Sequence, residues 1–157
     1  MARWKNFSIW HGRFPHWRAD AVLYYVAIKH KRELDDEERQ VLFREFLKPN
    51  DRKWTVRALV VTGEKSEALV SVHEAPHGAP YELGDIVRRA VQRSAKAIMA
   101  RSGERWPPMY EEPFDRIMRD DEETSKFLDE MLANVPCEGL DPVTGYQFCF
   151  VTTDDPE

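Results

Sequence analysis

The sequence predicts a mixed α/β fold of the α+β kind. Short runs of β-branched and aromatic residues, typical of strands, alternate with longer amphipathic segments that begin with acidic residues and end near Pro or Gly, as helices do. The chain has 157 residues, and a compact chain of this length buries about two-thirds of its unfolded surface. No linker or internal repeat divides it, so we expect one domain.

The first half contains a strand, a helix and two further strands, which we expect over residues 21–31, 34–50, 53–64 and 66–75. The run Val22–Ile28 is apolar enough for a buried strand. The helix starts with the acidic residues Asp35–Glu38, which suit the positive end of its dipole, and Pro49 follows its last turn. The two later strands lie close on either side of Gly63, which predicts a hairpin.

The second half contains a helix, a strand, a helix and an apolar run, which we expect over residues 83–103, 113–119, 120–135 and 146–151. Gly103 suits a C-terminal cap, and Pro136 and Gly139 end the second of these helices. The final run has the length of a strand or of an extended packed segment. The resulting order predicts a ferredoxin-like split βαβ sandwich, an antiparallel sheet with helices on one face, plus an extra C-terminal helix and tail.

The charge of the chain is unevenly distributed. The formal net charge is −5, which argues against a uniformly basic nucleic-acid binder. Residues 1–32, however, contain seven Lys and Arg and only one acidic residue, Asp20. We therefore expect three regions: a basic aromatic arm over residues 1–20, the domain over residues 21–151, and a loose tail over residues 152–157.

Cysteine usage and hydropathy indicate the compartment. Cys137 and Cys149 are too few for a disulfide framework, and we expect both to be buried thiols in a reducing environment. No apolar stretch approaches the roughly 18 residues that a membrane helix needs, and the N-terminus has no apolar signal core. We expect a cytoplasmic protein with no membrane partner.

Four separated stretches are similar, in order and spacing, to one protein family. They are PHWRADAVLYYVAIKHKRELDDEER, WTVRALVVTGEKSEALVSV, EEPFDRIMRDDEE and FLDEMLANVPCEGL. Read together, they resemble the REP-associated branch of the HUH-type tyrosine transposases. The resemblance extends from Pro15 to about Leu140.

The resemblance implies a ferredoxin-like core that binds palindromic DNA hairpins and cuts one strand through a tyrosine. It also implies a divalent metal, Mg²⁺ or Mn²⁺, held by a His-hydrophobe-His pair on a strand. Lys65 and Glu67 stand where the family has these histidines, and Glu130 or Met131 stands at the nucleophile position. No tyrosine occurs between residues 111 and 145, so we expect no intact catalytic residue and no metal or other cofactor.

The tyrosines and histidines outside these positions offer little replacement chemistry. Tyr110 and Tyr146 are the nearest tyrosines, and we interpret both as ordinary aromatic packing residues. His73 and His77 are four residues apart, but Pro76 between them prevents the helical geometry that a metal pair would need.

Two interpretations remain open for Lys65 and Glu67: a solvent-facing pair at the start of a strand, or the remnant of a catalytic pocket that now serves for binding.

For DNA contacts we expect Arg13, Trp17 and Arg18 of the arm, because cations interleaved with aromatic residues suit backbone contact and base stacking. We add a stripe on the helix over residues 83–103, although a solvated helix face is the alternative explanation: Arg89, Arg93 and Lys96.

The sequence thus predicts a transposase-like DNA-binding protein that is catalytically inactive and takes hairpin or single-stranded DNA. The first alternative is a protein-interaction or regulatory module that has lost DNA binding. The second is an active metal-dependent single-strand endonuclease. Relatives in this family pair as dimers, so an exposed edge strand suggests a homodimer.

Overall fold

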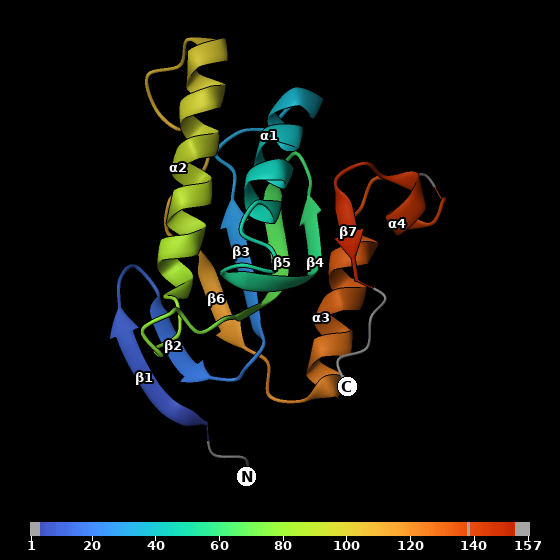
Figure 1. Cartoon of the computed structure of the whole chain (residues 1–157). Coiled ribbons are helices and arrows are strands. Elements are labelled where there is room, and N and C mark those ends of the chain that lie inside the picture. The colour runs from blue at the N-terminus through green and yellow to red at the C-terminus, as the bar shows by residue number, and fades with distance from the viewer. Residues whose placement is uncertain (1–3, 138, 153–157) are drawn as a thin grey trace.

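The computed structural model describes residues 4–137 and 139–152. A five-stranded antiparallel sheet lies at its centre, and a separate two-stranded hairpin lies beside it (Figure 1). The strands are β1 (Lys5–His11), β2 (Pro15–Asp20), β3 (Tyr24–Lys29), β4 (Trp54–Val61), β5 (Lys65–Val72), β6 (Phe114–Ile117) and β7 (Cys149–Val151). The helices are α1 (Asp36–Leu47), α2 (Leu83–Ser102), α3 (Asp121–Ala133) and the short α4 (Pro142–Gly145).

The predicted mixed α+β class is confirmed. The sheet order is β6-β3-β5-β4-β7, with every neighbouring pair antiparallel. The helix α1 joins β3 to β4, and β5 lies between these two strands; in the same way α2 joins β5 to β6, and β3 lies between them. This interleaving is the split βαβ arrangement, to which β7 adds an outer strand.

Helices cover both faces of the sheet. Alternate side chains of a strand point to opposite faces, so Tyr24 and Val26 of β3 pack with α1 and α2, whereas Tyr25 packs with Met131 of α3. The prediction placed helices on one face and an extra helix after them. The structure shows that α1 and α2 share a face and that the extra helix, α3, closes part of the other.

The expected helix ends are confirmed. Asp35 and Glu38 form a capping box, in which each side chain accepts a hydrogen bond from the other residue's backbone N–H. Gly103 ends α2 in the left-handed conformation, with φ 76°, which a residue without Cβ adopts at little cost.

The predicted N-terminal arm contains two strands. Residues 5–20 form an antiparallel hairpin in which Trp10 pairs with His16. The sequence pattern does not mark these strands, because every β1 residue is exposed and the apolar alternation typical of a strand is weak there. Residues 1–3 of the arm and residues 153–157 of the predicted tail lie outside the described part of the chain. Within that part, no helix is both long and apolar enough to cross a membrane.

Candidate functional site

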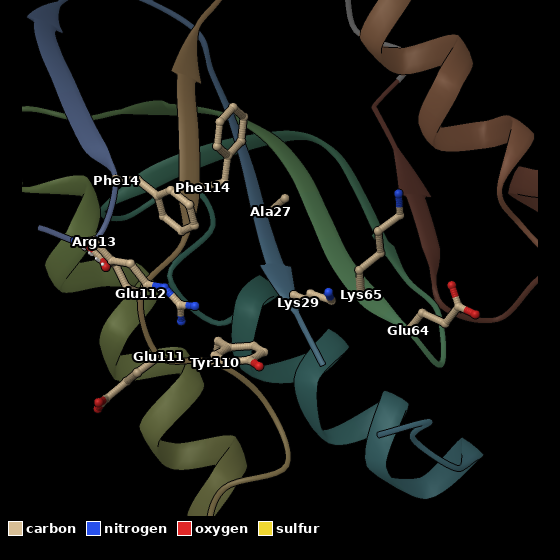
Figure 2. A pocket seen from close by; sticks show the side chains of 10 residues that line it. All are labelled: Arg13, Phe14, Ala27, Lys29, Glu64, Lys65, Tyr110, Glu111, Glu112 and Phe114. Carbon is tan, nitrogen blue, oxygen red and sulfur yellow. Dashed lines mark hydrogen bonds between the residues drawn. The ribbon is translucent and has the colours of Figure 1, made fainter. Parts of the chain in front are cut away.

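A cleft of about 570 Å³ opens on the same face of the sheet as α3 (Figure 2). Its walls come from the tip of the β1–β2 hairpin, from β3, from the start of β5 and from the segment before β6. The lining residues are Arg13, Phe14, Ala27, Lys29, Glu64, Lys65, Tyr110, Glu111, Glu112 and Phe114. We call this hollow the sheet cleft.

Strand register brings two lysines together in the sheet cleft. In the antiparallel pair of β3 and β5, Lys29 lies opposite Lys65, and Ala27 lies opposite Glu67. All four side chains share a face because each pair is two residues from the next. Ala27 fills little space, so the cleft reaches the sheet between the bulkier neighbours (Figure 2).

Glu67 is buried, so the interpretation of Lys65 and Glu67 as a solvent-facing pair is wrong for the glutamate. Only 4% of Glu67 is exposed. The Tyr25 hydroxyl donates a hydrogen bond to its Oε2, while Lys65 Nζ lies 3.4 Å from its Oε1. Burial, followed by the hydrogen bond to Glu67, raises the pKa of Tyr25, so its hydroxyl stays protonated and keeps donating.

This donor set does not fit a divalent cation. Glu67 offers one carboxylate, which already accepts from Tyr25 and lies next to an ammonium. Magnesium and manganese need several oxygen or nitrogen ligands, and a protonated lysine supplies none. Among residues 4–137 and 139–152, no group of three or more His, Cys, Asp and Glu side chains is arranged to hold a metal.

The positions matched to the family's nucleophile lie on α3. Met131 is fully buried in the core between α3 and the sheet, and Glu130 is exposed. The charge of Glu130 is the smallest of the causes that raise the pKa of Tyr25, after burial and Glu67. Lys65 and Glu67 thus lie together on β5, and neither position matched to the nucleophile holds a tyrosine.

The two tyrosines singled out in the sequence have different environments. The Tyr146 hydroxyl donates to the backbone oxygen of Val61 at 2.6 Å, which is a packing role. Tyr110 instead lines the sheet cleft, and Arg13 Cζ and Lys31 Nζ lie 5.3 and 5.2 Å from its ring centroid. Tyr110 is thus a polar aromatic surface flanked by cations, as in cation–π contacts.

A buried ionic cluster fixes the hairpin that forms one wall of the cleft. The His16 side chain is fully buried, with Nδ1 2.6 Å from Asp115 and Nε2 2.8 Å from Glu112. Arg18 lies 2.9 Å from Asp115 and 2.8 Å from Glu82. No local sequence pattern indicates this cluster, since His16 and Asp115 are 99 residues apart.

Two pKa shifts agree with these contacts. Burial alone would lower the pKa of Arg18, but Asp115 and Glu82 raise it above its ordinary value. The hydrogen bond from His16 holds the pKa of Glu112 below 4.5. Both groups are therefore charged at neutral pH, and the cluster holds the hairpin to β6 through ion pairs.

The residues predicted to contact DNA lie in three places. Arg13 lines the sheet cleft. Trp17 is 44% exposed and packs edge-on against Phe7, on the outer side of the hairpin, whereas Arg18 is buried in the ionic cluster and is not free to bind phosphate. The stripe on α2 lies on the opposite side of the sheet, where all three cations are exposed: Arg89, Arg93 and Lys96.

Most of the cleft lining was not predicted as site residues from the sequence, including its aromatic residues and one of its lysines: Phe14, Tyr110, Phe114 and Lys29. Phe14 and Phe114 pack edge-to-face with ring centroids 6.2 Å apart, across the hairpin and β6. Alternation along β3 could have placed Lys29 on the face of Ala27, but only the pairing of β3 with β5 places it opposite Lys65.

Comparison with known proteins shows the fold. No family model matches the chain, and no curated protein matches it by sequence. Among solved structures, it is similar to a REP-associated tyrosine transposase bound to a REP hairpin, with a TM-score of 0.64 and 14% sequence identity. The match covers 82% of this chain and 75% of that chain. At this identity the likeness concerns the fold and not the site.

Proposed function

We propose that the protein is a transposase-like DNA-binding protein that holds single-stranded or hairpin DNA without cutting it. The observation that carries the proposal is the sheet cleft, which combines cations and accessible aromatic rings on the sheet face where Lys65 and Glu67 stand. The likeness in fold to a structure of a transposase bound to a hairpin supports the choice of DNA as ligand.

The cleft offers both kinds of contact that single-stranded DNA uses. Lys29, Lys65 and Arg13 supply positive charge for phosphates, and the rings of Phe14 and Phe114, each more than a third exposed, supply stacking surface. Base stacking on an aromatic side chain contributes about 1–3 kcal/mol per base and tolerates any base. This chemistry favours an unpaired stretch of DNA over a fully paired duplex.

The acidic residues of the lining are largely engaged elsewhere. Glu112 accepts hydrogen bonds from His16 and from the Arg13 backbone N–H. Glu111 accepts from Gln92 of α2, and its carboxylate points away from Lys29 and Lys65 (Figure 2). Glu64 is the third acidic residue of the lining, and Lys65 lies next to Glu67, so the lining carries as many acidic as basic side chains. Lys29 and Arg13 are therefore the cations best placed to meet a phosphate backbone.

The proposal excludes strand cleavage because nucleophile and metal set are both replaced. Neither Glu130 nor Met131 can form a phosphotyrosine link, and the Lys65–Glu67 pair does not fit a divalent ion. We expect no nicked product from hairpin or single-stranded DNA with Mg²⁺ or Mn²⁺. A nicked product that disappears in Tyr110→Phe would overturn this part and establish the endonuclease alternative.

Binding is tested by titrating labelled hairpin and unstructured single-stranded DNA and following fluorescence anisotropy at several salt concentrations. We expect salt-dependent binding that weakens about tenfold in Lys29→Gln/Lys65→Gln. The matched control is Lys5→Gln/Lys126→Gln, which makes the same charge change at two exposed lysines outside the cleft. Equal losses in both variants, or no binding at low salt, would refute the proposal; the second result favours a protein-interaction module.

The homodimer remains a proposal. β6 and β7 are the outer strands of the five-stranded sheet, and an outer strand with free backbone groups can pair with a second copy. Light scattering of the purified protein tests this directly, and a monomer at all concentrations would contradict it.

A further inference from the structure

A second hollow lies on the other side of the sheet, between the end of α1 and the N-terminal half of α2. It has a volume of about 250 Å³. α1 and α2 run side by side over this face (Figure 1). The lining residues are Glu45, Lys48, Pro49, Arg52, Lys53, Ile86, Arg89, Ala90 and Arg93. We call this hollow the helix groove.

The helix groove is the more cationic of the two hollows, with five basic side chains and one carboxylate. Across residues 4–137 and 139–152, no carboxylate lies within ion-pair distance of Arg52, Arg89 or Arg93. Other arginines of the chain behave differently, since Arg101 and Arg119 each pair with carboxylates. Positive charge is therefore concentrated and unneutralised here, although the whole chain is acidic.

Local structure explains how these cations converge. Arg89 and Arg93 are four residues apart on α2 and so lie on the same side of the helix. Ile86 and Ala90, which are buried, form the apolar floor beneath them. The turn after Pro49 brings Arg52 and Lys53 to the opposite wall. Asp51 of that turn lines a different hollow.

We propose that the helix groove binds the phosphate backbone of duplex DNA. The groove has cations but no aromatic lining residue, so it suits phosphates and offers no stacking surface for unpaired bases. The inference deepens the proposed function and rests on it. Since the groove and the sheet cleft lie on opposite faces of the sheet, they take different segments of DNA.

The structure revises the stripe expected from the sequence. Arg89 and Arg93 line the groove, whereas Lys96, one turn further along α2, does not. Three residues that the sequence did not suggest join them: Lys48, Arg52 and Lys53. Only the packing of α1 against α2 brings the two sets together.

Glu45 provides a variant that gains binding. Its Oε1 lies 2.8 Å from Lys48 Nζ, and its buried Oε2 has no hydrogen-bond partner in the described part of the chain. Glu45→Gln removes the one negative charge of the groove and releases Lys48. We expect it to bind duplex DNA more tightly, a result that a misfolded protein cannot give.

The test titrates a labelled blunt-ended DNA duplex at several salt concentrations. We expect Arg52→Gln/Arg89→Gln/Arg93→Gln to weaken duplex binding about tenfold or more, and to lower the slope of log affinity against log salt by about 2–3. The matched control makes the same charge change at three exposed cations that line neither hollow: Arg44, Arg105 and Lys126.

The outcomes separate the two proposals. Loss of duplex binding in the groove variant, with single-stranded binding equal to that of the control, supports the helix groove. Equal duplex binding in groove and control variants overturns it while leaving the sheet cleft intact. Absence of any DNA binding overturns both. Titration with tripolyphosphate distinguishes a free phosphate ligand from the backbone of DNA. If tripolyphosphate binds at the helix groove and the duplex does not, the groove is a small-anion site and the inference fails.

Discussion

Replacing Asp115 by alanine tests whether the ionic cluster holds the β1–β2 hairpin in place. The Asp115 side chain is fully buried and accepts from Arg18 at 2.9 Å and from His16 at 2.6 Å. In Asp115→Ala both partners remain, and Arg18, whose side chain is only 9% exposed, loses its buried counter-charge. The hairpin carries Arg13 and Phe14, so its attachment matters for the sheet cleft.

The size of the effect follows from these contacts. Removing one partner of a buried ion pair costs about 3–5 kcal/mol, because an uncompensated charge stays buried. Glu82 still faces Arg18 at 2.8 Å, and its side chain is 43% exposed, so it offsets part of the cost. We expect about 3 kcal/mol, which is roughly a hundredfold change in the equilibrium for hairpin opening.

Native-state hydrogen exchange measures this equilibrium by region. We expect the β2 amides to exchange roughly a hundredfold faster in Asp115→Ala, while those of β4 and β5 change much less. Asp115→Asn keeps an acceptor for Arg18 but removes its counter-charge, so its loss should be smaller than that of Asp115→Ala and larger than that of an exposed control. Asp129→Ala, at an exposed site on α3, is the control.

Two results would refute this reasoning. If the β2 amides exchange in Asp115→Ala as they do in the wild type, the ionic cluster does not hold the hairpin. If all strands accelerate equally, the cluster stabilises the whole domain and not the hairpin alone. In either case, weaker binding of single-stranded DNA by Asp115→Ala could not be assigned to a displaced cleft wall.

Three further predictions concern single buried groups. Burial lowers the pKa of His30 below 6.5, so the unfolded chain gains the proton first and the free energy of unfolding falls as pH drops below 6.5. Urea titrations at several pH values measure this fall. The free energy of unfolding should depend less steeply on pH in His30→Gln than in the wild type, and an equally steep dependence would contradict the prediction. Tyr25→Phe leaves the buried Glu67 carboxylate without its donor and should cost about 1–3 kcal/mol of unfolding free energy, whereas a loss below about 0.5 kcal/mol would show that the hydrogen bond contributes little. Burial raises the pKa of Cys149 to about 11, so Ellman's reagent at pH 8 should label the more accessible Cys137 first and Cys149 only on unfolding; equal rates would refute the difference.

The sequence predicted the central sheet and its helices because their signals are local. Apolar runs such as Val22–Ile28 and end signals such as Asp35 and Gly103 depend on neighbours within a few residues. The β1–β2 hairpin was missed because β1 is exposed throughout, and because the buried positions of β2 hold the polar residues His16 and Arg18, so neither strand shows an apolar alternation. The contacts that hold it, such as His16 with Asp115, join distant parts of the chain.

The candidate site was predicted in part for the same reason. Alternation along one strand places Lys65 and Glu67 on a common face, and this is a local property. Whether that face is solvent or core depends on where α3 packs, and the sequence left that open. Lys29 lies opposite Lys65 because of the register between β3 and β5, and no local pattern specifies that register.

The buried position of Glu67 also shows why likeness of fold does not determine the chemistry at this position. The Glu67 side chain is enclosed on the face of the sheet that α3 covers. A carboxylate enclosed in this way must find a donor, and Tyr25, on the neighbouring strand, supplies it. This hydrogen bond satisfies the buried carboxylate of Glu67, but it occupies an oxygen atom that a metal ion would need as a ligand. A fold similar to that of a transposase is therefore compatible with a buried carboxylate that does not fit a divalent cation, and the function must be argued from the cations and rings around the cleft.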